Sequence, residues 1–141
     1  MKRGLLRRVE PSLSKSQLSV KEAVKWWDES IKNRDAGAYS SSLITSYLAI
    51  FHASRAILFR DGIREKSHYC IGVYLEAYQE KGLLEERWTL LFNRMRNSRH
   101  AGQYSFQTTP THDEAESSIK SAKAFINRIK RLLEEQKPPV I

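Results

Sequence analysis

Three arginines, two asparagines and one histidine lie within the stretch FNRMRNSRHAGQY at positions 92–104. On an α-helix, Asn93, Arg96, Asn97 and His100 have the spacing i, i+3, i+4 and i+7 and therefore share one face. Arginine offers a fixed fork of donors for phosphate, asparagine can orient a hydroxyl group or a water, and histidine exchanges a proton near neutral pH. The pattern indicates a polar helix face whose side chains can converge on one phosphate.

Metal-free RNA cleavage needs a base for the 2′-OH proton, a cation for the charge that grows on the phosphate, and an acid for the leaving 5′ oxygen. This helix face carries no carboxylate, so acid and base roles would have to fall mainly to His100, with Arg94 and Arg96 as the cations. The remaining candidates in the segment, for substrate binding, are Asn93, Asn97, Arg99 and Tyr104. The same spacing also suits passive phosphate binding or a solvated face, so these alternatives stay open.

The two arginines are not equivalent on a helix. Arg96 precedes His100 by four residues and shares its face, whereas Arg94 points about 120° away at ideal helical geometry. We keep both as candidate partners of the histidine. The opposite side of the same helix should pack into a core, because an apolar stripe runs along it through Trp88, Leu91, Phe92 and Met95.

Composition bounds the class of protein. The 141 residues carry 24 Lys and Arg against 16 Asp and Glu, and this net charge of +8 favours polyanionic partners such as RNA, DNA or nucleotides. The single cysteine, Cys70, excludes an intrachain disulfide and a paired-cysteine metal site, so the expected compartment is the reducing cytoplasm. No apolar run approaches the roughly 20 residues of a membrane span. We expect no membrane contact, no metal and no other cofactor.

Helical periodicity predicts an all-α protein with no strand. Capping boxes are predicted at Ser19 with Glu22 and at Thr111 with Glu114, and Gly62 is the expected end of the second helix. The five helices are expected at about 19–36, 38–61, 67–80, 84–100 and 111–135. Short connections between them predict an up-and-down antiparallel bundle, with the longest connection at 102–110.

The expected organisation is one domain at 18–136, preceded by a basic flexible arm at 1–17 and followed by a tail at 137–141. Within the bundle, His52 is expected to be a hydrogen-bonded packing histidine. Trp26 lies off the apolar stripe of the first helix, so it should either widen the buried face or contact a second subunit.

Two segments carry a family resemblance. SYLAIFHASRAILFRDGI, at 46–63, resembles the second helix of the HEPN domain family, and RMRNSRHAGQY, at 94–104, resembles its signature segment. The likeness covers residues 19 to 135 and is greatest to small stand-alone prokaryotic members. The family signature is an arginine, four to six residues, then a histidine. Arg94 and His100, with five residues between them, satisfy it, and Arg96, with three, does not.

The resemblance implies a HEPN-like helical bundle that acts as a metal-independent endoribonuclease. In characterised relatives the two signature segments meet across a homodimer, and many are toxins encoded beside a small nucleotidyltransferase antitoxin. In some, the partner modifies a tyrosine two residues after the histidine; here Gly102 has that place and Tyr104 lies two residues beyond it. Other members have lost the catalytic pair and bind only nucleotides, so a non-catalytic nucleotide-binding or partner-binding subunit is the alternative.

A third interpretation, non-specific binding of DNA or RNA through net charge and the basic arm, ranks last. The sequence has no evident recognition-helix pattern and no evident aromatic stacking platform for bases.

Overall fold

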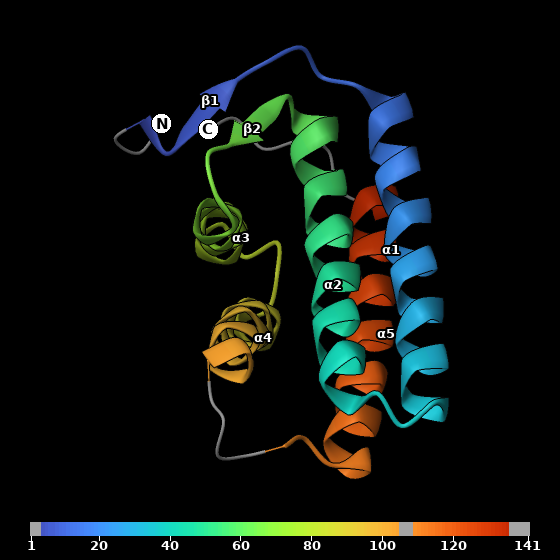
Figure 1. The fold of residues 1–141 in the computed structure, drawn as a ribbon. Helices are drawn as coiled ribbons and strands as arrows, with labels where there is room; N and C mark the ends of the chain where they lie inside the picture. Colours follow the sequence, from blue (N-terminus) through green and yellow to red (C-terminus); the bar gives the residue numbers. More distant parts are fainter. Residues whose placement is uncertain (1–3, 105–108, 136–141) are drawn as a thin grey trace.

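The computed structural model describes residues 4–104 and 109–135, with side chains described for 4–98 and 109–135. In chain order its elements are β1 (Leu6–Arg8), α1 (Leu13–Asp35), α2 (Tyr39–Asp61), β2 (Ile63–Glu65), α3 (His68–Glu80), α4 (Glu86–Tyr104) and α5 (His112–Glu135). The predicted five-helix antiparallel bundle is confirmed. Helices α1, α2 and α5 lie side by side, and the α3–α4 pair crosses them on the other side of α2 (Figure 1).

Helix α2 is the centre of this arrangement and packs against each of the other four helices. Tyr47, Ile50 and Ile57 are fully buried, which accounts for its apolar composition. By length and composition α2 is also apolar enough to cross a membrane, but 61% of its apolar window is buried inside the protein, as in a core helix. Gly62 ends it in the left-handed conformation at a φ of 73°, as predicted.

The expected start of the first helix at Ser19 is wrong. Helix α1 begins at Leu13, and the side chain of Ser12 caps it by accepting a hydrogen bond from the Lys15 amide at 3.1 Å. Ser19 is buried, and its hydroxyl donates to the carbonyl oxygen of His52 on α2 at 2.7 Å. Ser19 therefore contributes to the packing of α1 on α2. The local sequence alone, a serine followed three residues later by a glutamate, does not distinguish this role from a helix cap.

The prediction of an all-helical chain without strands is also wrong in detail. Strands β1 and β2 pair antiparallel, with Leu6 opposite Glu65 and Arg8 opposite Ile63. Each strand has three residues, too few to show an alternating pattern in sequence. The flexible arm expected at 1–17 is corrected accordingly, because its residues 6–8 form β1 and 13–17 begin α1. Residues 1–3 and the expected tail at 137–141 lie outside the described residues.

Helix α4 is longer than expected. It continues to Tyr104, so Gly102 lies inside the helix and the connection to α5 is shorter than the predicted 102–110. The capping box at the start of α5 is confirmed: the Glu114 amide donates to Thr111 Oγ1 at 3.1 Å, and the Thr111 amide donates to Glu114 Oε1 at 3.2 Å.

Two aromatic side chains singled out by sequence are partly buried. Trp26 packs against the core, so it widens the buried face of α1. The ring of His52 lies edge-on to Phe51 at a centroid distance of 5.0 Å, and burial lowers the pKa of His52 below its usual 6.5. A neutral packing role for His52 agrees with this environment.

Candidate functional site

The apolar stripe of α4 anchors this helix in the core as predicted. Its four residues are each no more than 8% exposed: Trp88, Leu91, Phe92 and Met95. Trp88 also contacts Phe125 of α5 edge-on, with ring centroids 6.0 Å apart. Because this side of α4 is buried in the core, the polar residues of the signature segment lie on the other sides of the helix.

Arg96 is held against α3. Its guanidinium carbon lies 5.2 Å from the ring centroid of Tyr69, within cation–π distance. Its Nη2 donates to Asn97 Oδ1 at 3.4 Å, while Nη1 is shielded from solvent and has no hydrogen-bond partner among the described residues. The guanidinium as a whole is half-buried beside the ring, and its positive charge can attract an anion to this face of α4.

Asn93 reaches α3 because that helix carries a glycine at the contact. A Cβ added to Gly72 would lie 2.6 Å from Asn93 Oδ1, which is shorter than any ordinary contact. Gly72 is buried and Asn93 is half-buried, so the two helices approach closely here. This requirement for glycine was not predicted, since it depends on which helix faces α4.

Arg94 lies on another side of α4 from Arg96. It is exposed and lines a cleft of about 430 Å³ between α2, α4 and α5. The other lining residues are Leu43, Leu91, Met95, Ser98, Glu114, Ser117, Ser118 and Ser121. The two candidate arginines thus diverge, as ideal helical geometry indicates: Arg96 contacts α3, and Arg94 faces the cleft beside α5.

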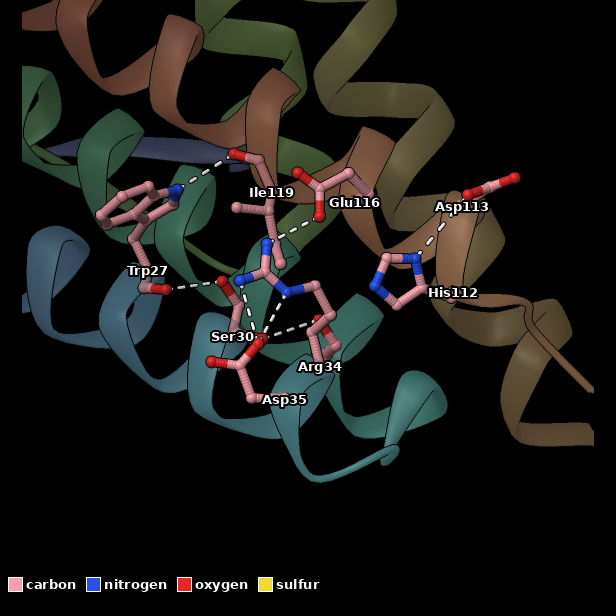
Figure 2. A network of polar contacts seen from close by, with 9 residues as sticks. Trp27, Ser30, Arg34, Asp35, His112, Asp113, Glu116 and Ile119 are labelled. Carbon is pink, nitrogen blue, oxygen red and sulfur yellow. Dashed lines mark hydrogen bonds and ion pairs between the residues drawn. The ribbon is translucent and has the colours of Figure 1, made fainter.

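The α5 wall of this cleft is attached to α1 by polar contacts (Figure 2). Arg34 Nη1 lies 2.6 Å from Glu116 Oε2, and the same guanidinium contacts Asp35 at 3.0 Å. One turn further along α5, Trp27 Nε1 donates to the carbonyl oxygen of Ile119 at 3.0 Å. These contacts fix the position of the N-terminal half of α5, which follows the connection from α4.

Helix α3 is positioned by a histidine that the sequence did not single out. His68 stacks on Phe51 of α2 with ring centroids 4.1 Å apart, and its Nδ1 lies 2.8 Å from the hydroxyl oxygen of Tyr47. His68 is the first residue of α3 and precedes Tyr69. The packing of this ring therefore sets the place of the tyrosine that contacts Arg96.

Three predicted site residues have side chains outside the described residues: Arg99, His100 and Tyr104. Their backbone continues α4. Because the helix is unbroken from Arg96 through His100, the two positions fall on the same face of α4, one turn apart.

A second polar cluster, which sequence reasoning missed, lies at the C-terminal end of α2. Asp61 accepts hydrogen bonds from the hydroxyl groups of Tyr74, at 2.6 Å, and of Tyr78, and Arg60 Nε donates to its other oxygen at 3.0 Å. The Asp61 side chain is 2% exposed. Burial raises the pKa of both tyrosines, so they remain hydroxyl donors. Every member has a partner, which is typical of a structural network.

Comparisons with known proteins find one family profile and two relatives. The profile of the HEPN domain matches residues 16–132. A protein named "Putative toxin MJ0605" from Methanocaldococcus jannaschii is 32% identical over 101 residues, which cover 69% of this chain and 72% of that protein. A UPF0332 protein from Archaeoglobus fulgidus is 26% identical over 122 residues, 86% of this chain and 97% of that protein.

Proposed function

Because the chain belongs to the HEPN domain family, we propose that it is a metal-independent endoribonuclease, the toxin component of a toxin–antitoxin pair that acts in the cytoplasm. The observation that supports this most is the position of Arg96, which is held beside Tyr69 one helical turn before His100. The relative of 32% identity, which carries the name "Putative toxin MJ0605", supports the biological role.

In the proposed reaction the 2′ oxygen bonds to phosphorus as the P–O5′ bond breaks, which leaves a 2′,3′-cyclic phosphate and a 5′-hydroxyl group. His100 takes the 2′-OH proton as the base and gives it to the leaving 5′ oxygen as the acid. Arg96 stabilises the charge that develops on the phosphate, because its guanidinium is already oriented and partly desolvated by the Tyr69 ring. Asn97, whose Oδ1 accepts from Arg96, keeps this guanidinium in place and orients the substrate. Cleavage by this route needs no metal and no cofactor.

The remaining candidates bind the substrate on either side of the scissile phosphate. Arg94 adds positive charge at the mouth of the cleft beside α5, and Asn93 contributes a polar contact at the α3–α4 boundary. Arg99 and Tyr104, on the last turns of α4, are proposed to contact the same strand.

We also propose a homodimer in which the two α4 segments meet, and a nucleotidyltransferase antitoxin as the protein partner. The exposed apolar side chain of Leu90, on the outer surface of α4, is compatible with a contact between subunits, since it is 57% exposed. Light scattering tests the dimer, because a species of 16.4 kDa alone would contradict it.

Incubation of the purified protein with single-stranded RNA in EDTA tests the activity. The wild-type protein should cleave the RNA, and the His100→Ala variant should not. His112→Ala is the matched control, because His112 is an exposed histidine at the start of α5. Intact RNA with the wild-type protein, or equal cleavage by the His100→Ala variant, would contradict the proposal.

The cleft that Arg94 lines favours a second candidate function, a nucleotide-binding subunit without chemistry that pairs with a nucleotidyltransferase. Three serine hydroxyls of α5 and one arginine surround about 430 Å³, which is enough for a nucleotide. Titration calorimetry with ATP should then show saturable binding that Arg94→Gln weakens, with no RNA cleavage by the wild-type protein.

A further inference from the structure

The β1–β2 ribbon presents like charges directly opposite each other. Arg7 and Arg64 are paired across the two strands, and both are exposed. Because neighbouring residues of a strand alternate between its faces, Lys66 continues the same outer face just beyond β2, and it is exposed as well. Like charges directly opposite destabilise a strand pair. The Arg7–Arg64 pair therefore lowers the stability of a ribbon that has only three residues in each strand.

Nearby acidic groups do not neutralise this face. Glu65 is the adjacent carboxylate, but it points to the other face and binds Arg55 Nε at 2.7 Å, with its side chain only 12% exposed. Within residues 4–98 and 109–135, no ion pair involves Arg7, Arg64 or Lys66. A shallow hollow of about 230 Å³ lies among Gly4, Arg7, Arg64, Glu65 and Lys66. Three cations and one carboxylate line this hollow, and the carboxylate is already paired with Arg55, so the net positive charge suits a phosphate group.

The ribbon leads directly to the polar face of α4. Lys66 is followed by Ser67, the N-cap of α3, and then by the first turn of α3, which contains Tyr69. Tyr69 is 57% exposed although the guanidinium of Arg96 lies over its ring. The ribbon, α3 and α4 follow one another along the same side of α2 (Figure 1). Along the chain, the exposed cations of the ribbon are thus followed by an exposed aromatic ring on α3 that contacts the signature segment, and we call these four residues the track.

We propose that this track, Arg7, Arg64 and Lys66 on the ribbon and Tyr69 on α3, binds single-stranded RNA and leads it to Arg96. The inference rests on the proposed function for what happens at α4. The ribbon cations contact successive phosphates, and the Tyr69 ring stacks on an unpaired base. A duplex keeps its bases stacked inside and cannot use Tyr69. The aromatic platform that the sequence did not reveal is therefore supplied by the packing of α3 against α4.

Fluorescence anisotropy with a labelled single-stranded RNA tests the track. It is measured on the full chain carrying His100→Ala, so that binding is recorded without cleavage. The double variant Arg7→Gln/Arg64→Gln should lower the slope of log affinity against log salt by about 1.4, because each lost single-strand phosphate contact accounts for about 0.7. Tyr69→Leu should weaken binding roughly 5- to 150-fold, and Tyr69→Phe, which keeps the ring, should restore it.

The matched control is Lys21→Gln/Lys25→Gln, which removes two exposed charges from α1, a helix on the other side of α2 from the track (Figure 1). It should leave affinity and salt slope close to those of the parent. An equal loss in this control, an unchanged ribbon variant, or tighter binding of duplex RNA than of the single strand would overturn the inference. Circular dichroism confirms that each variant is folded.

The same set of variants separates this inference from the proposed function. If the chain with His100 intact leaves RNA uncleaved but binds it through the track, the ribonuclease proposal fails and the track stands. If RNA is cleaved with His100 present but the ribbon and Tyr69 variants bind normally, the track fails and the ribonuclease proposal stands.

Discussion

Two polar clusters of this molecule use similar side chains in opposite ways. Around Asp61, one carboxylate, two tyrosine hydroxyls and the guanidinium of Arg60 are joined by hydrogen bonds and withdrawn from water. Around Arg96, the guanidinium has a weak contact to Asn97, an aromatic ring beneath it and one donor without a partner among the described residues. The groups of the first cluster are paired with one another, whereas the guanidinium of the second has no ion pair among the described residues.

The difference separates stability from function on physical grounds. A buried network whose members are all paired is expensive to disturb, because loss of one member leaves charges and hydroxyls without partners. A partly exposed guanidinium without an ion pair adds little to the free energy of unfolding but can stabilise a negative charge that binds beside it. Substitutions in the two clusters should therefore have opposite effects on stability and on activity.

The largest effect on stability is expected for Asp61→Ala. The change leaves Arg60, whose side chain is 10% exposed, and two tyrosine hydroxyls without their shared acceptor. We expect the free energy of unfolding to fall by about 3–5 kcal/mol, measured by urea denaturation. Asp113→Ala, at a fully exposed carboxylate, should change it by less than about 0.5 kcal/mol. Similar changes in the free energy of unfolding for Asp61→Ala and Asp113→Ala would show that the Asp61 cluster does not stabilise the fold.

Arg96→Gln should have the reverse profile. Loss of the exposed cation–π contact should lower the free energy of unfolding by no more than about 1 kcal/mol, while RNA cleavage should slow roughly 100- to 1000-fold. Single-turnover cleavage rates measure this, with Arg94→Gln as the paired variant on another side of α4. A larger loss of rate for Arg94→Gln than for Arg96→Gln would assign the catalytic cation to the cleft.

A smaller, pH-dependent effect is expected at Glu85, which joins the start of α4 to α5. Hydrogen bonding from Arg128 is the main cause that lowers the pKa of Glu85 from 4.5 to about 2. The folded protein thus binds this proton less readily than the unfolded chain. The stabilisation is complete above about pH 4.5 and is lost as the pH falls towards 2.

Glu85→Gln should therefore lower the free energy of unfolding at pH 7 by roughly 0.2–1 kcal/mol, since the carboxylate is half exposed. The difference from the wild-type protein should vanish near pH 2. Urea denaturation at several pH values measures it, with Glu80→Gln as the exposed control. A difference that does not depend on pH would contradict the assignment.

An effect of similar size but opposite sign, a gain in stability, is expected for Arg64→Glu. An attractive pair with Arg7 would replace the repulsive one, so the free energy of unfolding should rise by roughly 0.2–1 kcal/mol. The same variant should bind single-stranded RNA more weakly. Urea denaturation measures the change in stability, and anisotropy on the same preparation measures the change in RNA affinity. A loss of stability would show that repulsion between the two arginines does not destabilise the ribbon.

Local signals in the sequence were sufficient for most of the helices. Gly62 and the capping box of Thr111 with Glu114 identify helix ends through interactions within a few residues. The start of α1 was misplaced, because Ser19 forms its hydrogen bond with α2, a contact that lies 33 residues away in the chain. The two short strands escaped prediction because each is defined by its partner and not by its own pattern.

The candidate site divides in the same way. Helical geometry alone predicts that Arg94 and Arg96 lie on different sides of α4. In the structure Arg94 lines the cleft beside α5 and Arg96 contacts Tyr69 of α3. The contacts of Arg96 with Tyr69 and of Asn93 with Gly72 depend on which face of α3 meets α4. Such pairings are set by packing of the whole domain, so spacing within one helix could not predict them.

Cleavage of one oligonucleotide in two chemical forms shows whether this protein is a ribonuclease that depends on the 2′-OH and on His100. The wild-type protein in EDTA is given an RNA and its counterpart with 2′-deoxyribose throughout, and product formation is followed by electrophoresis. We expect cleavage of the RNA alone, because His100 must act on a 2′-OH, and no cleavage of either form by the His100→Ala variant. Cleavage of the deoxy form, or of the RNA by the variant, would contradict it.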